Sequence, residues 1–158
     1  MVTIEDNVLD LEKHHKKQET NFTCGAASYR IILSILGTKI SENQAILDCQ
    51  TKKSGTNINN VFSALKNKFK NKDINLVNLD VNFNDYCHYL DLISKSNICY
   101  LSNLYISNSG RGRNQNRFHT ACCFSGLIFD PSENFPVLIN SYFHTFNKNL
   151  FLRNMILV

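Results

Sequence analysis

The order of helical and strand-like segments constrains the fold of this chain more than any other feature of its sequence. Apolar residues recur at helical spacing through most of the first part, and short apolar runs bounded by turn residues follow. Helices are expected over 24–36, 41–49, 57–69 and 83–94, and strands over 74–79, 98–106, 118–124, 127–130 and 150–158. Helices followed by mostly antiparallel strands predict an α+β fold, with N-terminal helices packed on a C-terminal antiparallel sheet.

Length and composition indicate one domain with its own core. The chain has 158 residues, of which 43% are hydrophobic and 19% are charged, as is typical of a globular protein. We predict a single domain over 1–158, with 1–17 as a polar N-terminal lead, and we expect a monomer. The basic cluster His14-His15-Lys16-Lys17 is interpreted as a solvated surface turn, because no nearby cysteine or acidic residue completes a metal site.

Charge and cysteine patterns exclude several classes of function. The net charge is only +4 and the lysines are scattered, so no nucleic-acid partner is expected. No apolar run approaches the ~20 residues of a membrane span, and no signal peptide is visible. We therefore expect a cytoplasmic protein, with signal-peptide-independent export as an effector as the alternative. The six cysteines form no Cys-x-x-Cys pair, so neither a disulfide framework nor a metal or other cofactor is predicted.

A cysteine lies at the predicted start of the first helix. The polar stretch Gln18-Glu-Thr-Asn-Phe-Thr-Cys24-Gly25 leads directly into the apolar run 29–36. A thiol at this point meets the free N–H groups and the positive dipole end of the helix, which favour its thiolate. The side-chain amide of Gln18 could point back to the same place. The stretch therefore indicates a nucleophile with a candidate oxyanion donor, and a structural cysteine is the alternative.

A thiolate nucleophile needs a base and a group that orients the base. His119 begins one predicted strand and Asp130 ends the next, and Ser125-Gly126 joins them as a tight turn. His119 and Asp130 are therefore expected to be direct or diagonal cross-strand neighbours. The carboxylate would favour the imidazolium, which would lower the pKa of Cys24. Each residue alone is more often structural, and Asp before Pro131 is often a turn former, but together they predict a Cys-His-Asp site.

The same residues carry a resemblance to a known family. The ordered elements are Gln18, Cys24-Gly25-Ala26-Ala27, Gly55-Thr56, His119 and Asp130-Pro131. This pattern resembles the papain-like peptidases of the bacteriocin-processing, double-glycine type, over roughly residues 15–158. Such peptidases form the N-terminal domain of peptidase-containing ABC transporters and also occur as stand-alone proteins. A stand-alone form is expected here, because the sequence stops at Val158 with no transporter attached.

The resemblance implies a papain-like fold and a role for each matched residue. Cys24 would be the nucleophile, His119 the general base and later acid, and Asp130 the orienting group. Gln18 would complete an oxyanion hole with the backbone N–H of Cys24. The resemblance further implies a cysteine peptidase that forms an acyl-enzyme with a peptide or protein substrate and processes a leader peptide.

Two departures from the family pattern leave alternatives open. Thr23 precedes the nucleophile where transporter-borne domains commonly have Asp, and only Ser125-Gly126 separates the two strands that carry His119 and Asp130. Glutamine-deamidating bacterial effectors use the same constellation, so a deamidase acting on a partner protein is one alternative. A non-catalytic papain-like binding module is the second. The polar segment Ser107–Arg117 is interpreted as a solvated loop, and the docking of an acidic partner is its alternative role.

Overall fold

The computed structural model describes residues 11–82, 99–106, 117–139, 141–142 and 150–158. Its elements are α2 (Cys24–Ile35), α3 (Glu42–Asp48), α4 (Ile58–Lys68), β1 (Asn75–Asn82), β2 (Tyr100–Ile106), β3 (Arg117–Phe124), β4 (Leu127–Phe129), β5 (Val137–Leu138) and β6 (Leu150–Leu157). The expected helix over 83–94 lies outside the described residues. The expected loop over 107–117 also lies outside them, except that Arg117 is the first residue of β3.

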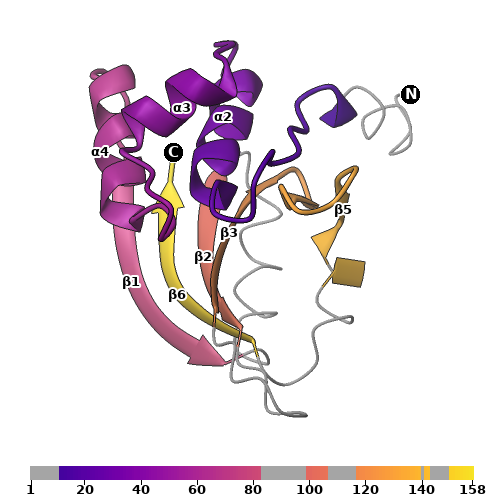
Figure 1. The fold of residues 1–158 in the computed structure, drawn as a ribbon. Coiled ribbons are helices and arrows are strands. Elements are labelled where there is room, and N and C mark those ends of the chain that lie inside the picture. Colours follow the sequence, from indigo (N-terminus) through magenta and orange to yellow (C-terminus); the bar gives the residue numbers. More distant parts are fainter. Residues whose placement is uncertain (1–10, 83–98, 107–116, 140, 143–149) are drawn as a thin grey trace, which may run out of the picture.

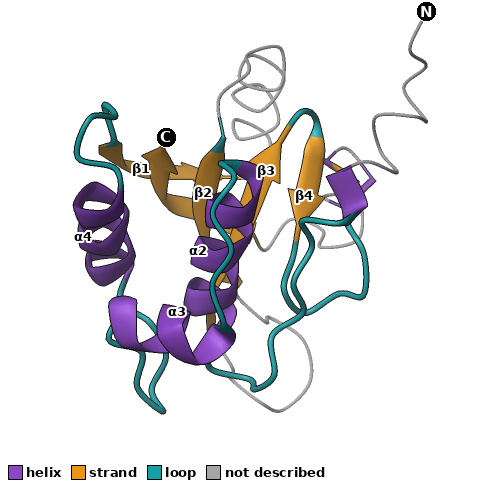
Figure 2. Cartoon of the chain, turned by 90° about the horizontal axis from the view of Figure 1, so that it is seen from above, coloured by secondary structure: helices purple, strands orange, loops and turns teal. Residues whose placement is uncertain are grey.

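The strands form one antiparallel sheet in the order β1-β6-β2-β3-β4-β5. Helices α2, α3 and α4 lie together on one face of it (Figure 1), and the view from above separates the two layers (Figure 2). The predicted α+β arrangement of N-terminal helices on a C-terminal antiparallel sheet is therefore confirmed. Within the described residues, no helix is long and apolar enough to cross a membrane.

Local signals in the sequence account for the helix boundaries. The Ser41 hydroxyl accepts a hydrogen bond from the Gln44 N–H at the start of α3, and the Asn57 side chain accepts one from the Asn59 N–H at the start of α4. Gly37 follows α2 with a φ of +87°, which is the left-handed conformation that glycine supplies after a helix. These helices begin and end within about two residues of the predicted positions.

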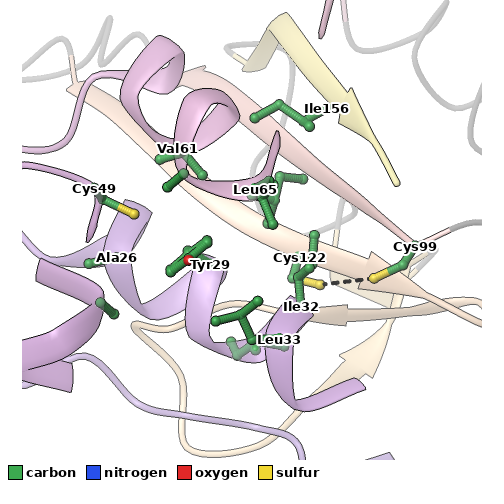
Figure 3. Close-up of a cluster of buried hydrophobic side chains, with 14 of the residues drawn as sticks. Ala26, Tyr29, Ile32, Leu33, Cys49, Val61, Leu65, Cys99, Cys122 and Ile156 are labelled. Atoms are coloured by element: carbon green, nitrogen blue, oxygen red, sulfur yellow. Dashed lines mark hydrogen bonds between the residues drawn. The ribbon is translucent and has the colours of Figure 1, made fainter. Parts of the chain in front are cut away.

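The main core lies between α2 and the sheet (Figure 3). Tyr29, Ile32 and Leu33 of α2 are fully buried together with Cys122 of β3 and Ile156 of β6. A second buried cluster belongs to the opposite face of the sheet and includes Tyr100, Leu104, Ala121, Ile128 and Met155. Because both faces of the central strands are buried, β2 and β4 are rich in apolar residues, whereas β1 at the edge of the sheet alternates with polar residues.

Candidate active site

Cys24 is the first residue of α2 and is partly exposed. The N-cap residue Thr23 makes no side-chain hydrogen bond to the helix. Its hydroxyl instead donates to the carbonyl of Thr20 at 3.1 Å. The Gly25 N–H lowers the pKa of Cys24. The N–H groups of the first turn are therefore left for the thiolate and for negative charge beside it.

Gly25 lets a second segment approach the nucleophile. A Cβ atom at this position would lie 2.6 Å from the Cβ of Thr56, which is closer than side chains can pack. Thr56 is itself held by a 2.8 Å hydrogen bond between its hydroxyl and that of Thr51. The Gly55-Thr56 element therefore has a physical role, because it packs against the residue that follows Cys24.

His119 and Asp130 are brought together by the β3–β4 hairpin. Ser125 and Gly126 have φ values of +52° and +78°, as in the two-residue turns that suit the twist of a hairpin. The register pairs Cys122 with Phe129, which makes His119 and Asp130 diagonal neighbours across the end of the hairpin. Their side chains form a hydrogen bond of 2.6 Å between Nε2 and Oδ1, in agreement with the prediction from the turn.

Asp130 is 1% exposed and accepts hydrogen bonds from two further residues. Oδ1 also accepts from the backbone N–H of Ser132 at 2.8 Å and from its hydroxyl at 2.7 Å. Oδ2 accepts a short hydrogen bond from the Tyr142 hydroxyl. Burial alone would raise the pKa of Asp130, but His119, Tyr142 and Ser132 together hold it well below its usual range. The group is therefore a fixed carboxylate.

One buried hydrogen bond joins the two halves of the site. The Ser28 hydroxyl on α2 donates to the Thr120 carbonyl on β3 at 2.8 Å, across a sequence separation of 92. It lies one turn after Cys24 and next to His119, where α2 packs against β3. The His119 side chain and the Thr120 backbone both lower the pKa of Cys24, which places them beside its thiol. Because Asp130 occupies Nε2, Nδ1 is the nitrogen of His119 left for Cys24.

This geometry lowers the pKa of Cys24 and raises the pKa of His119, which favours an ion pair between the two side chains. Burial raises the pKa of Cys24, but His119 and the backbone N–H groups of Thr120 and Gly25 outweigh it and lower the pKa below its ordinary value. Burial lowers the pKa of His119, but Asp130 and Cys24 reverse this effect and raise it to about 9. Thiolate and imidazolium therefore stabilise each other, as nucleophilic thiol chemistry requires.

Gln18 lies beside the Asp130 end of the site. Its backbone N–H donates to the carbonyl of Pro131 at 2.8 Å. Its side-chain Oε1 is buried and has no hydrogen-bond partner among the described residues. The Gln18 backbone is thus held next to the loop that carries Asp130, and the side-chain oxygen forms no hydrogen bond within the described residues.

A cleft of about 960 Å³ opens beside Cys24. Its walls come from the start of α2, from the segment that includes Lys52 and Thr56, and from β2, β3 and β6. Within the described ranges, no group of three or more His, Cys, Asp or Glu side chains is arranged to bind a metal ion. The cleft therefore presents a thiol and polar side chains to any bound molecule.

Three contributing residues were not identified from the sequence. Ser132 could have been found, because an Asp that accepts from the N–H two residues later is a common turn signal. Ser28 reads only as a small residue in an apolar helix, although it connects α2 to β3. Tyr142 carried no signal, since no periodic pattern assigns its segment to a helix or a strand.

Comparison with protein-family models gave no match, and comparison with curated proteins gave no significant one. Solved structures do match. One is a double glycine motif protease from an AMS/PCAT transporter in complex with the leader peptide, with 19% identity, a TM-score of 0.51 and coverage of 88% of each chain. Another is the peptidase domain of Streptococcus ComA, a bi-functional ABC transporter involved in a quorum-sensing pathway, with 14% identity and a TM-score of 0.54. That match covers 91% of this chain and 96% of the other. The expected papain-like fold is confirmed.

Proposed function

We propose that the protein is a cysteine peptidase related to the bacteriocin-processing, double-glycine peptidases. The observation that carries this proposal is the 2.6 Å hydrogen bond between His119 and Asp130, together with the lowering of the Cys24 pKa by His119, while Cys24 lines a cleft of about 960 Å³. The shared fold with two peptidase domains supports it. In this proposal Cys24 is the nucleophile, His119 the acid–base group and Asp130 the orienting group.

The reaction follows from the protonation states of the ion pair. The Cys24 thiolate attacks the substrate carbonyl carbon, and the C=O electron pair moves to oxygen, where the Cys24 N–H and the Gln18 amide receive the negative charge. The tetrahedral intermediate collapses, the C–N bond breaks, and the His119 imidazolium protonates the leaving amine. Neutral His119 then takes a proton from water as the water attacks the thioester. Collapse of the second intermediate releases the acid and restores the thiolate.

We further propose that the substrate is a peptide, with a leader peptide as the most informative first candidate. One of the similar structures is named as a complex with a leader peptide. The cleft beside Cys24 is large enough for several residues of a peptide, because ligand clefts of this kind span roughly 300–1,000 Å³. A leader peptide that carries a double glycine and continues beyond it is therefore the first substrate to test.

Mass spectrometry of a synthetic double-glycine leader and of a random peptide pool tests this function. We expect wild-type protein to split peptides, Cys24→Ala to be inactive, and Cys49→Ala to remain active because Cys49 is buried in the core. Cleavage that survives in Cys24→Ala would overturn the proposal. Conversion of a glutamine amide to a carboxylate without chain cleavage would assign the deamidase alternative, and no chemical change in any peptide would contradict a hydrolase.

Labelling by iodoacetamide tests the ion pair without a substrate. At mildly acidic pH we expect Cys24 to react faster than every other thiol, because the thiolate is the reacting form. Cys49 is the internal reference, since burial and the nearby Asp48 raise its pKa to about 12. Equal rates at Cys24 and at a free model thiol would show that the pair is not activated.

A further inference from the structure

The cleft beside Cys24 is positively charged. Among its lining residues only Lys52 and Lys53 are charged, and no lining residue within the described ranges is Asp or Glu. Both lysines are exposed, and no described side chain forms an ion pair with either of them. Two cations therefore border the cleft without an ion-pair partner in the described part of the chain.

Backbone contacts fix these lysines close to the nucleophile. Lys52 and Gly55 exchange two backbone hydrogen bonds, of 3.1 and 2.9 Å, which close a tight turn around Lys53. Gly55 has a φ of +110°, a conformation that glycine adopts without strain. The next residue, Thr56, packs against Gly25. The turn is thus attached to the start of α2 and not to a remote surface.

The strands beside the cleft carry a row of amide side chains, of which Asn103 and Asn154 line it. The Asn103 amide donates to the Asn154 oxygen at 3.0 Å, and the Asn154 amide donates to the Asn78 oxygen at 2.6 Å. Thr120 is the register partner of Asn103 on β3 and extends the row to the neighbour of His119. The amide groups left unused in this row can pair with the N–H and C=O groups of an extended peptide.

We propose that Lys52 and Lys53 make the cleft selective for peptides with an acidic side chain close to the scissile bond. This inference rests on the proposed function and names its substrate class. Lys53 precedes Thr56 by three residues, so their Cα atoms are at most about 11 Å apart. A lysine side chain extends the reach further, and an extended peptide rises about 3.3 Å per residue. The selected Glu or Asp therefore lies within about five residues of the bond that is cleaved.

Matched peptides that differ by Glu or Gln at one position test the selectivity. For wild-type protein we expect kcat/KM for the best-placed Glu peptide to exceed that for its Gln counterpart by about three- to tenfold, because exposed ion pairs contribute modestly. The ratio should fall as salt is added. Lys52→Gln combined with Lys53→Gln should bring the ratio close to one, and Lys52→Glu with Lys53→Glu should invert it toward Lys peptides.

Lys68→Gln combined with Lys70→Gln is the matched control, because both residues are exposed and lie outside the cleft. This variant has the same change in net charge and should keep the wild-type ratio. An equal loss of selectivity in both double variants would overturn the proposal, because net charge and not the cleft would then be responsible. A wild-type ratio of one at every position would overturn it as well.

Binding measurements separate this inference from the proposed reaction. Fluorescence anisotropy with Cys24→Ala protein measures the affinity for the same Glu and Gln peptides without chemistry. Charge-selective binding that requires Lys52 and Lys53, in a protein that cleaves no peptide, would contradict only the peptidase. Cleavage without selectivity in binding or in kcat/KM would contradict only the role of the two lysines.

Discussion

At the β3–β4 hairpin, Asp130 accepts hydrogen bonds from His119, Ser132 and Tyr142, whereas at the start of α2 the N-cap side chain makes no hydrogen bond to the first-turn N–H groups. Thr23 does not cap the helix, and Gln18, whose backbone bonds to Pro131, has a buried side-chain acceptor, Oε1, with no partner among the described residues. The hairpin therefore holds one protonation state and one ring orientation. The helix start keeps its hydrogen-bonding capacity for a ligand.

This difference indicates that the hairpin orients His119, whereas the start of α2 binds the ligand. A buried polar group without a partner costs about 1–3 kcal/mol, so a stable fold tolerates few of them, and those that persist are often at functional sites. The Asp130 carboxylate has its hydrogen bonds within the protein, so in this hairpin only His119 Nδ1 is left for the reaction. Variants of the hairpin should consequently change the pH dependence of the site, whereas a variant of Gln18 should change kcat alone. The largest expected effect is given first and the smallest last.

His119→Ala tests whether His119 on the hairpin activates the Cys24 thiol at the start of α2. We expect a loss of roughly 10⁶-fold in kcat, as when a catalytic base is removed. Burial is the largest influence on the Cys24 pKa and raises it, so without His119 this pKa should rise above its ordinary value. The pH dependence of iodoacetamide labelling measures the shift. His14→Ala is the control, since His14 bonds to Ser34 away from the site, and an unchanged labelling profile in His119→Ala would refute the coupling.

Asp130→Asn should move the pH profile as well as lower the rate. Burial lowers the pKa of His119, but Asp130 and Cys24 raise it to about 9. In wild-type protein kcat/KM should therefore fall as the pH rises through about 9, where the imidazolium is lost. Without the carboxylate the imidazolium is lost at lower pH, so the alkaline limb should shift to lower pH and kcat should fall about 10⁴-fold. An alkaline limb that stays in place would contradict the assigned role of Asp130.

Gln18→Ala tests the proposed oxyanion donor. We expect kcat to fall roughly 10²–10³-fold with little change in KM, because an oxyanion donor acts in the transition state. Labelling of Cys24 should be unchanged, since the amide does not contribute to the Cys24 pKa shift. Gln44→Ala is the control, because Gln44 bonds to Asp48 on α3. A changed labelling rate in Gln18→Ala would show that Gln18 acts on the thiol and not on the oxyanion.

Tyr142→Phe should give the smallest effect. Loss of a hydrogen bond to a buried carboxylate should lower the free energy of unfolding by about 1.5–3 kcal/mol. We also expect roughly tenfold lower kcat and an alkaline limb at lower pH, because Asp130 is held less firmly. Tyr29→Phe is a matched control, since the Tyr29 hydroxyl donates to Asp48 at 3.1 Å outside the site. It should lower stability alone, and an equal loss of activity in both variants would remove the positioning role of Tyr142.

Local chemistry explains how much of this structure the sequence predicts. The His119–Asp130 contact is predictable because a two-residue turn fixes the register of its hairpin, and Cys24 is predictable because the change from polar to apolar residues locates the helix start. The papain-like fold was expected from the family resemblance and not from periodicity. β5 could not be predicted, because a two-residue strand has no periodicity. The Tyr142–Asp130 contact depends on tertiary packing, for which the local sequence carries no signal.

The position of β6 has a consequence for how the protein is made. β6 comes last among the described strands, yet it pairs with both β1 and β2 in the interior of the sheet. β1 has no other strand partner in the described part of the chain. During vectorial synthesis the segments bearing Cys24, His119 and Asp130 all emerge before the strand that unites the sheet. Until β6 pairs, β1 has no strand partner among the described residues, so Cys24 reactivity followed during refolding would report when β6 joins β1 and β2.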